Sequence, residues 1–327
     1  MTSINSPVTS PPPNLVGLDV VRVLAMAMVV IQHTLSLADQ ENLTVIAGLS
    51  IGQLGVAIFL VVSGLLSCES RRTPVSWLSQ RLYRVYPAFW IAMVGSFCMA
   101  TLSGYKNASV GQIVSQMLGT GLWTHSGELV NSPTWFVSLI LACYLATFLS
   151  RAIGQPGRLA ALSSVGLTIL VARDAAPWLL SHFLTYAISS TIAAYAFGSN
   201  RKTATLSIAA AFGIMALAIQ PAFAYTALSL MIVELSLRLQ YRPRAIKLAA
   251  DCSYEFYLVH GVALAGALTM IKSSPVLAVI AALISSAVAA VILKGVATFM
   301  VRQLRPANRD NAPTNAAALT SNAIPQT

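Results

Sequence analysis

Long apolar runs separated by short polar segments dominate the chain. A membrane-spanning helix needs about 20 mostly apolar residues, and runs that approach this length recur between residues 15 and 301. On this criterion we predict ten spanning helices, at residues 15–37, 49–67, 85–103, 133–151, 159–172, 175–198, 203–219, 221–237, 249–271 and 275–301. The pattern therefore predicts an all-α integral membrane protein.

The composition supports the same class of protein. The 327 residues are 56% hydrophobic and 9% charged, whereas a soluble domain carries about 25% charged residues. The net charge of +10 would also suit nucleic acid. However, the basic residues form short clusters between apolar blocks, an arrangement typical of topology signals and of contact with anionic lipid. We therefore expect a lipid bilayer as partner and no nucleic acid.

Charge placement orients the predicted helices. With a cytoplasmic N-terminus, the inner segments hold fifteen Lys and Arg residues and the outer segments hold only Lys106, Arg173 and Lys272. This positive-inside bias predicts that both termini are cytoplasmic. It also supports the short fifth span, because the basic residues on either side of residues 159–198 share one side only if two spans separate them.

Both ends of the chain are polar. Residues 1–14 are rich in Pro and Ser, and residues 305–327 are mostly polar or small. We expect both segments to be disordered and residues 15–304 to form one transmembrane domain. The longest loop, residues 104–132, lies outside in this topology, and part of it is expected to lie at the membrane interface as an amphipathic segment.

The first predicted helix carries three ionisable residues, Asp19, Arg22 and His33. Such groups are costly inside a span and commonly mark a functional site. Arg22 and His33 are eleven residues apart, so they share one helix face about 16 Å apart along the axis. Asp19 lies within pairing reach of Arg22. Position alone leaves a second interpretation open, with Arg22 snorkelling and His33 among the outer headgroups.

Several blocks of the sequence resemble the membrane-bound acyltransferase-3 family. "GLDVVRVLAMAMVVIQH" is similar to the family's first helix, whose signature is an Arg and a His separated by ten residues, as Arg22 and His33 are. Four more blocks follow in the family's order: "GVAIFLVVSGLL" (55–66), "RLYRVYPAFW" (81–90), "PTWFVSLILACYL" (133–145) and "SYEFYLVH" (253–260). Five ordered blocks over residues 17–260 identify the chain as a member, without the SGNH domain that some members carry.

The resemblance implies acyl transfer from cytoplasmic acyl-CoA, often acetyl-CoA, to a hydroxyl group. Family members modify lipopolysaccharide, exopolysaccharide, peptidoglycan, Nod factors or macrolides. We expect a membrane-embedded O-acyltransferase of a bacterial inner or plasma membrane, with a carbohydrate or glycolipid acceptor, acyl-CoA as donor substrate and no further cofactor. The alternative is a transporter or flippase in which the Arg22–His33 stripe lines a translocation path, because intramembrane charges suit that function too.

The resemblance also implies roles for the first helix. His33 is the expected catalytic base, because an imidazole with an unperturbed pKa near 6.5 can take the proton of an attacking hydroxyl at neutral pH. Arg22 would anchor the donor or orient the site, and Asp19 would hold its guanidinium.

Other candidates lie along the matched blocks. Arg81 and Arg84 suit the phosphates of coenzyme A. The alternative is plain positive-inside topology, which Arg71 and Arg72 could satisfy alone. The remaining candidates could line the passage, and aromatic residues near helix ends are also common interface anchors: Trp135, Tyr254, Tyr257 and, in mid-span, His260.

Three more ionisable residues fall within the predicted helices. Glu234, Glu255 and Lys294 lie toward the inner side, where they could line a donor entrance or, more simply, pair with one another. The four histidines fall on different elements without a metal-binding spacing, so we expect no metal site.

Overall fold

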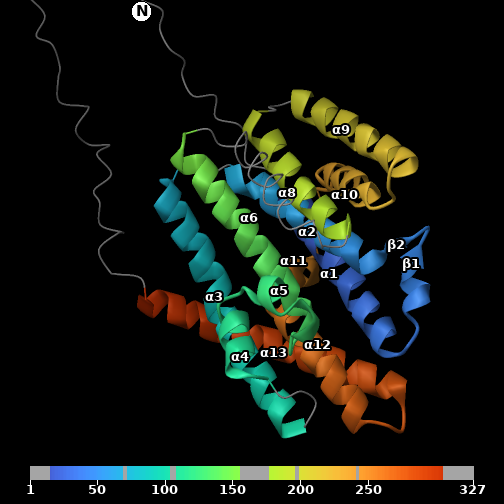
Figure 1. Ribbon diagram of the computed structural model, residues 1–327, viewed down its shortest axis with the longest axis vertical. Helices are drawn as coiled ribbons and strands as arrows, with labels where there is room; N and C mark the ends of the chain where they lie inside the picture. The colour runs from blue at the N-terminus through green and yellow to red at the C-terminus, as the bar shows by residue number, and fades with distance from the viewer. Residues whose placement is uncertain are drawn as a thin grey trace, which may run out of the picture.

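The computed structural model describes residues 15–68, 72–103, 108–154, 177–195, 199–240 and 243–304. Over these ranges the chain is nearly all α-helical (Figure 1), which confirms the all-α part of the predicted fold class. A two-stranded antiparallel hairpin, β1 (Val45–Ile46) and β2 (Leu49–Ser50), is the only sheet in the described ranges. Its turn uses Ala47 and Gly48, both at positive φ. The sequence had not predicted this hairpin, which follows the short 3-10 helix η1 (Glu41–Thr44).

The long helices correspond to nine of the ten predicted spans. They are α1 (Leu15–Leu37), α2 (Ile51–Cys68), α3 (Pro74–Ser103), α6 (Trp135–Ala152), α8 (Pro177–Tyr195), α9 (Ser199–Ala218), α10 (Phe223–Ser236), α12 (Ser253–Met270) and α13 (Pro275–Leu304). The fifth predicted span, residues 159–172, lies outside the described residues.

Four described helices are both long and apolar enough to cross a membrane: Val16–Leu37, Pro74–Leu102, Ser132–Ala152 and Pro275–Gln303. Ile51–Ser67 and Phe223–Ser236 are apolar but shorter. The protein is thus a membrane protein by its helices, whereas the count of ten spans and the cytoplasmic termini stay predictions.

The start of α3 differs from the prediction. The helix begins at Pro74 rather than near residue 85, so Arg81 and Arg84 lie on it rather than in a segment before it. The local sequence explains the early start. Thr73 Oγ1 accepts a hydrogen bond from the backbone N–H of Ser76, and Pro74 occupies the first helical position, where its missing N–H costs nothing.

The predicted span at residues 249–271 is wrong at its start. The chain forms a short helix, α11 (Arg244–Asp251), and then α12, with a break at Cys252. At the break, the Asp251 carbonyl accepts a hydrogen bond from Lys294 Nζ at 2.7 Å. Ser253 Oγ donates to the Ala250 carbonyl at 2.8 Å. Side chains thus bond the carbonyls where the helix is interrupted.

The described residues between α3 and α6 contain four short helical elements: α4 (Val110–Met117), α5 (Gly121–Thr124), η2 (Ser126–Glu128) and η3 (Ser132–Thr134). Ser109 and Gln112 form a capping box at the start of α4. This helix exposes Val110 and Val114 and buries Ser115 and Gln116. That distribution suits apolar surroundings, as the interfacial prediction for this loop requires.

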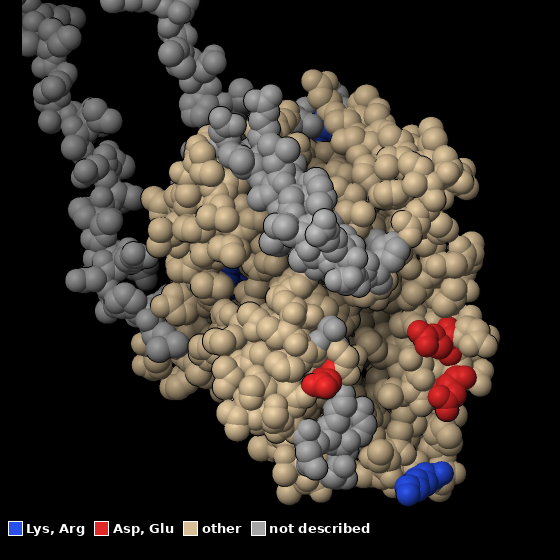
Figure 2. All heavy atoms as spheres, in the orientation of Figure 1, with Lys and Arg blue, Asp and Glu red and all other residues tan. Residues whose placement is uncertain are grey.

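Helix α13 exposes large apolar side chains, unlike a surface helix of a soluble protein. Its small residues Ala278, Ala282 and Ala290 are buried, whereas bulky aliphatic residues such as Ile284 and Ile292 are exposed. Small residues at interfaces let membrane helices approach closely, because lipid already satisfies large apolar side chains. On the face shown in Figure 2, few of the described residues are charged.

Helix α1 lies between two sets of helices. It packs against α2 and α10 on one side and against α11 and α12 on the other. Leu18, Val21, Ala25 and Val29 form its buried stripe. The approach of α2 is close, because a Cβ added at Gly55 would lie 2.5 Å from the Ala25 carbonyl oxygen. This packing leaves the ionisable face of α1 toward α11 and α12.

Candidate functional site

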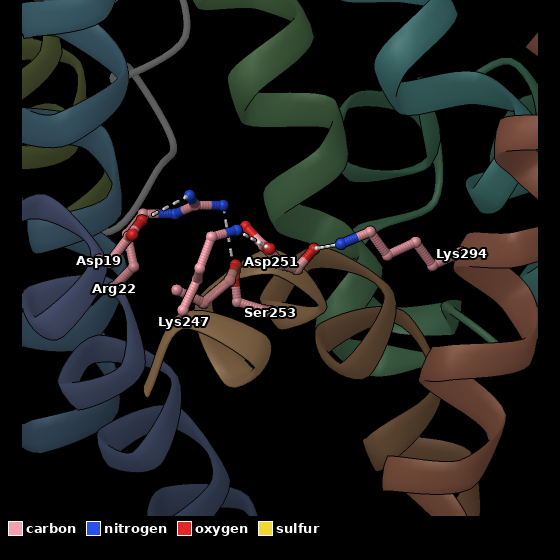
Figure 3. A network of polar contacts seen from close by, with 7 residues as sticks. Asp19, Arg22, Lys247, Asp251, Ser253 and Lys294 are labelled. Carbon is pink, nitrogen blue, oxygen red and sulfur yellow. Dashed lines mark hydrogen bonds and ion pairs between the residues drawn. The ribbon is translucent and has the colours of Figure 1, made fainter. Parts of the chain in front are cut away.

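Arg22 is held between two helices at one end of the site. Its Nη1 lies 3.8 Å from Asp19 Oδ1 on the same helix, and its Nη2 donates a 3.2 Å hydrogen bond to Ser253 Oγ on α12 (Figure 3). The Arg22 and Asp19 side chains are only 18% and 14% exposed. The predicted Asp19–Arg22 pair is therefore confirmed, and Ser253 adds a contact from a distant part of the sequence.

The charged network continues through α11 to α13. Lys247 Nζ donates to Asp251 Oδ2 at 2.8 Å, and Lys294 Nζ bonds the Asp251 backbone (Figure 3). The hydrogen bond from Lys247 lowers the pKa of the Asp251 carboxyl, which therefore stays ionised well below neutral pH. Asp251 also lies within electrostatic range of Arg22.

The expected mutual pairing of Glu234, Glu255 and Lys294 is wrong. Glu234 pairs with Arg201 at 3.4 Å, and Lys294 bonds the Asp251 carbonyl because the break before α12 leaves that oxygen accessible. Glu255 Oε2 is buried and has no hydrogen-bond partner among the described residues. Arg22, Arg84 and Lys294 are its charged neighbours.

His33 marks the other end of the ionisable face of α1. Its ring centroid lies 5.2 Å from that of His260 on α12, with the two ring planes at 55°. Arg22 and His33 thus both contact α12, one near its start and one farther along. These contacts confirm that the two residues share a face of α1, as their spacing predicted.

A cavity of about 250 Å³ opens beside His33. Among the described residues, no Asp, Glu, Lys or Arg lines it. Its polar lining consists of the His33 imidazole, hydroxyl groups and one amide, and the rest is mainly apolar. A cavity with this lining can bind an uncharged, hydroxyl-bearing group and would disfavour a phosphate or carboxylate, which would lose hydration without gaining a countercharge.

Asn131 supplies the amide of this cavity and is itself 1% exposed. Its Nδ2 donates to the Leu258 carbonyl at 2.8 Å and to Ser96 Oγ at 3.3 Å. Both amide protons are therefore used, and Oδ1 has no partner among the described residues. A buried acceptor of this kind favours a ligand that donates a hydrogen bond.

The three aromatic candidates have different surroundings. The Tyr257 hydroxyl donates to the Pro133 carbonyl, and its ring lies 5.6 Å from the His260 ring. The Tyr254 hydroxyl donates to the Val85 carbonyl at 3.0 Å. Trp135 stacks on His182, 6.1 Å between ring centres, in a separate aromatic cluster with Trp178. Of the three, only Tyr257 has a ring contact with the His33–His260 pair among the described residues.

The two arginines of the basic block also differ. Arg81 Nη2 donates to the Leu66 carbonyl at 2.9 Å, and its guanidinium lies 5.5 Å from the Trp77 ring centre. Arg84 is exposed and has no hydrogen bond or ion pair to the described residues. It lies within electrostatic range of Arg22 and Glu255. Arg81 thus joins α2 to α3, whereas the guanidinium of Arg84 is available to a ligand.

Sequence reasoning missed Ser253 and Asn131. Ser253 is the first residue of the matched block "SYEFYLVH", so the resemblance contained a signal for it. Asn131 precedes a Ser-Pro turn, and such a position reads as an ordinary loop residue. Its partners Ser96 and Leu258 come from other helices, and no local pattern relates them to it.

Comparison with known proteins identifies the family of the chain. Residues 15–295 match a family model described as an acyltransferase domain, Acyl_transf_3. Comparisons with curated proteins and with solved structures gave no significant match.

Proposed function

The chain belongs to the acyltransferase-3 family, and from this premise we propose that it transfers an acyl group, in the first place acetyl, from acyl-CoA to a hydroxyl of a carbohydrate or glycolipid. Lipopolysaccharide and exopolysaccharide are acceptors of this class. The observation that carries the proposal is the position of His33, which faces a second imidazole and lines a cavity where the described residues contribute no charged side chain. The membrane is a bacterial inner or plasma membrane in this proposal.

His33 acts as the general base. The oxygen of the acceptor hydroxyl attacks the thioester carbonyl carbon while a ring nitrogen of His33 takes the hydroxyl proton. The C–S bond then breaks, the acyl group remains on the acceptor oxygen, and the departing sulfur receives a proton to leave as the coenzyme A thiol. General-base catalysis of this kind contributes roughly 10²–10⁴-fold in rate.

Arg22 helps to bind the acyl-CoA donor and does not contact the reacting carbonyl. Arg22 and His33 are eleven residues apart in the sequence, which is about 16 Å along the helix axis. One group at the reaction centre cannot touch both side chains at that separation. Coenzyme A is a long molecule with its phosphates at one end and its thioester at the other. Arg22, fixed by Asp19 and Ser253, is suited to hold such a donor some distance from its thioester.

Arg84 is the best candidate for a direct phosphate contact. Arginine binds phosphate with its planar fork of N–H groups, and the Arg84 guanidinium is free of hydrogen bonds to the described residues and exposed. Arg81 has part of its fork committed to the Leu66 carbonyl. We therefore assign donor phosphate binding to Arg84 first, with Arg81 mainly supporting the helix that carries it.

The acceptor site is the cavity beside His33. Its hydroxyl and amide lining suits the ring hydroxyls of a sugar, and its apolar lining suits the rest of a glycolipid. Acyl-CoA enters this proposal as a substrate, and the reaction as written uses no other cofactor.

The test is label transfer by the purified protein in vesicles. Radiolabelled acetyl-CoA is supplied together with glycolipids and polysaccharides extracted from cells that lack the protein. Label should appear on an extracted glycan with the wild-type protein and not with His33→Ala, provided that the variant inserts and purifies normally. Movement of glycolipid across the bilayer without label transfer would instead favour the transporter or flippase.

A further inference from the structure

The hydrogen bonding of His260 determines which of its ring nitrogens carries the proton. Its Nδ1 lies 2.7 Å from the backbone carbonyl oxygen of Tyr257. A carbonyl oxygen only accepts, so Nδ1 must donate, and in the neutral ring Nε2 is then a bare acceptor. The backbone of α12 thereby holds the ring in one tautomer, as a carboxylate or carbonyl does for the histidines of many catalytic sites.

This bare nitrogen is buried beside His33. His260 is 0% exposed, and its Nε2 has no hydrogen-bond partner among the described residues. The rings around it are those of Phe256 at 6.2 Å, Tyr257 at 5.6 Å and His33 at 5.2 Å. Phe256 has no polar atom in its ring, and the Tyr257 hydroxyl already donates to the Pro133 carbonyl. His33 is the remaining ring neighbour with a proton to offer.

The distance between the two imidazoles permits a hydrogen bond. A ring nitrogen lies roughly 1 Å from its ring centre, so rings 5.2 Å apart can bring two nitrogens to about 3 Å by a small side-chain rotation. We propose that His260 is a positioning residue for acyl transfer, whose Nε2 accepts the N–H of His33 and so presents the other, unprotonated nitrogen of His33 to the acceptor hydroxyl. This inference rests on the proposed function of His33 as general base.

The two imidazole rings therefore have different roles in the reaction. If His33 donates to His260, its remaining nitrogen carries a lone pair toward the cavity, and that nitrogen takes the proton of the attacking hydroxyl. The imidazolium that forms keeps its hydrogen bond to His260 Nε2, which stabilises the new charge without a buried carboxylate. Proton transfer to His260 is not required at any step.

A purely structural role for His260 makes a different prediction. Its ring stacks on Phe256 at an angle of 11°, so packing alone would be preserved best by His260→Phe. An acceptor role would be preserved best by His260→Gln, whose amide oxygen can take the place of Nε2 while the ring is lost. A packing role therefore predicts that His260→Phe is the more active variant, whereas an acceptor role predicts that His260→Gln is the more active one.

The first measurement is the initial rate of label transfer by both variants. We expect His260→Phe to lower kcat about tenfold or more, the effect of losing one hydrogen bond to a charged group, with the acyl-CoA KM unchanged. His260→Gln should retain clearly more activity. Equal rates, or a faster Phe variant, would overturn the positioning role while wild-type transfer leaves the proposed function intact.

The second measurement does not depend on activity. The chain has only 4 histidines, so nitrogen-15 histidine labelling gives few NMR signals, which single substitutions assign. In the wild-type protein we expect His260 protonated at Nδ1 with a hydrogen-bonded Nε2, and His33 in one tautomer that becomes mixed in His260→Phe. A His260 Nε2 signal typical of a nitrogen without a hydrogen bond would refute the contact even if no acyl transfer were detected.

Discussion

Arg22 on α1 donates a hydrogen bond to Ser253 at the start of α12, a residue 231 positions later in the chain. The contact joins the first and last of the five sequence blocks that resemble the acyltransferase-3 family. The Ser253 hydroxyl donates its own proton to the Ala250 carbonyl, so a lone pair of its oxygen faces the guanidinium. The orientation of Arg22 therefore depends on the break between α11 and α12.

Replacing Ser253 by Ala should weaken donor binding. Arg22 would keep Asp19 but lose its anchor on α12, and a hydrogen bond to a charged group contributes about 1.5–3 kcal/mol. Since the pair is only partly buried, we expect the acyl-CoA KM to rise about 3–10-fold with a smaller change in kcat. Ser286→Ala is the matched control, because Ser286 is also a buried helical serine and its Oγ has no partner in the described ranges. Equal KM values for the two variants would contradict a role for Ser253.

Most of the fold was predictable from hydropathy, because bulky apolar runs such as that of α13 have few other stable environments. The boundaries that failed depend on distant or capping contacts. The early start of α3 rests on Thr73 and Pro74, in a stretch too polar for a hydropathy criterion. The break at Cys252 accompanies a bond from Lys294, 43 residues from its partner Asp251.

The candidate site was predictable only along one helix. Helix periodicity placed Arg22 and His33 on one face because their relation is local. The His33–His260 and Arg22–Ser253 contacts join α1 to α12, and no spacing within the sequence relates those helices. Asn131 was beyond prediction for the same reason, since its orientation is set by residues of α3 and α12.

The Arg84→Ala substitution should affect donor binding, whereas the Arg81→Ala substitution should affect stability. Arg84 is exposed and unbonded to the described residues, so its loss should leave thermal stability in detergent nearly unchanged while raising the acyl-CoA KM about tenfold. Arg81→Ala removes the bond to the Leu66 carbonyl and the contact with the Trp77 ring. It should lower stability by about 1–2 kcal/mol. A raised KM in the Arg81 variant alone would reverse the assignment.

The orientation of the bundle can be tested at two exposed basic residues. Lys272 precedes α13 and Arg244 begins α11, and the positive-inside bias predicts that they lie outside and inside, respectively. In a variant without native cysteines, Lys272→Cys should react with a membrane-impermeant maleimide in intact cells. Arg244→Cys should react only after permeabilisation. The opposite pattern would invert the topology and move His33 to the cytoplasmic side.

Two glycines of α12 line the cavity beside His33 and offer a matched test of the acceptor site. A Cβ at Gly261 would lie 2.7 Å from Pro133 Cγ and 3.1 Å from Asn131 Oδ1, so Gly261→Ala must displace the segment that carries Asn131. A Cβ at Gly266 would meet only Met99 Cε, at an ordinary 3.7 Å.

Both substitutions add one methyl group, and alanine favours helix over glycine by about 1 kcal/mol, so propensity does not separate them. Gly261→Ala should lower kcat/KM for the glycolipid acceptor about tenfold, since a shift of the cavity wall by a fraction of an ångström misplaces the hydroxyl relative to His33. Its acyl-CoA KM should stay unchanged, because the donor phosphates bind at the Arg22 end. Gly266→Ala should resemble the wild type in both constants. If the two variants lose acceptor activity equally, or if Gly261→Ala affects only the donor, the hydroxyl does not bind in this cavity.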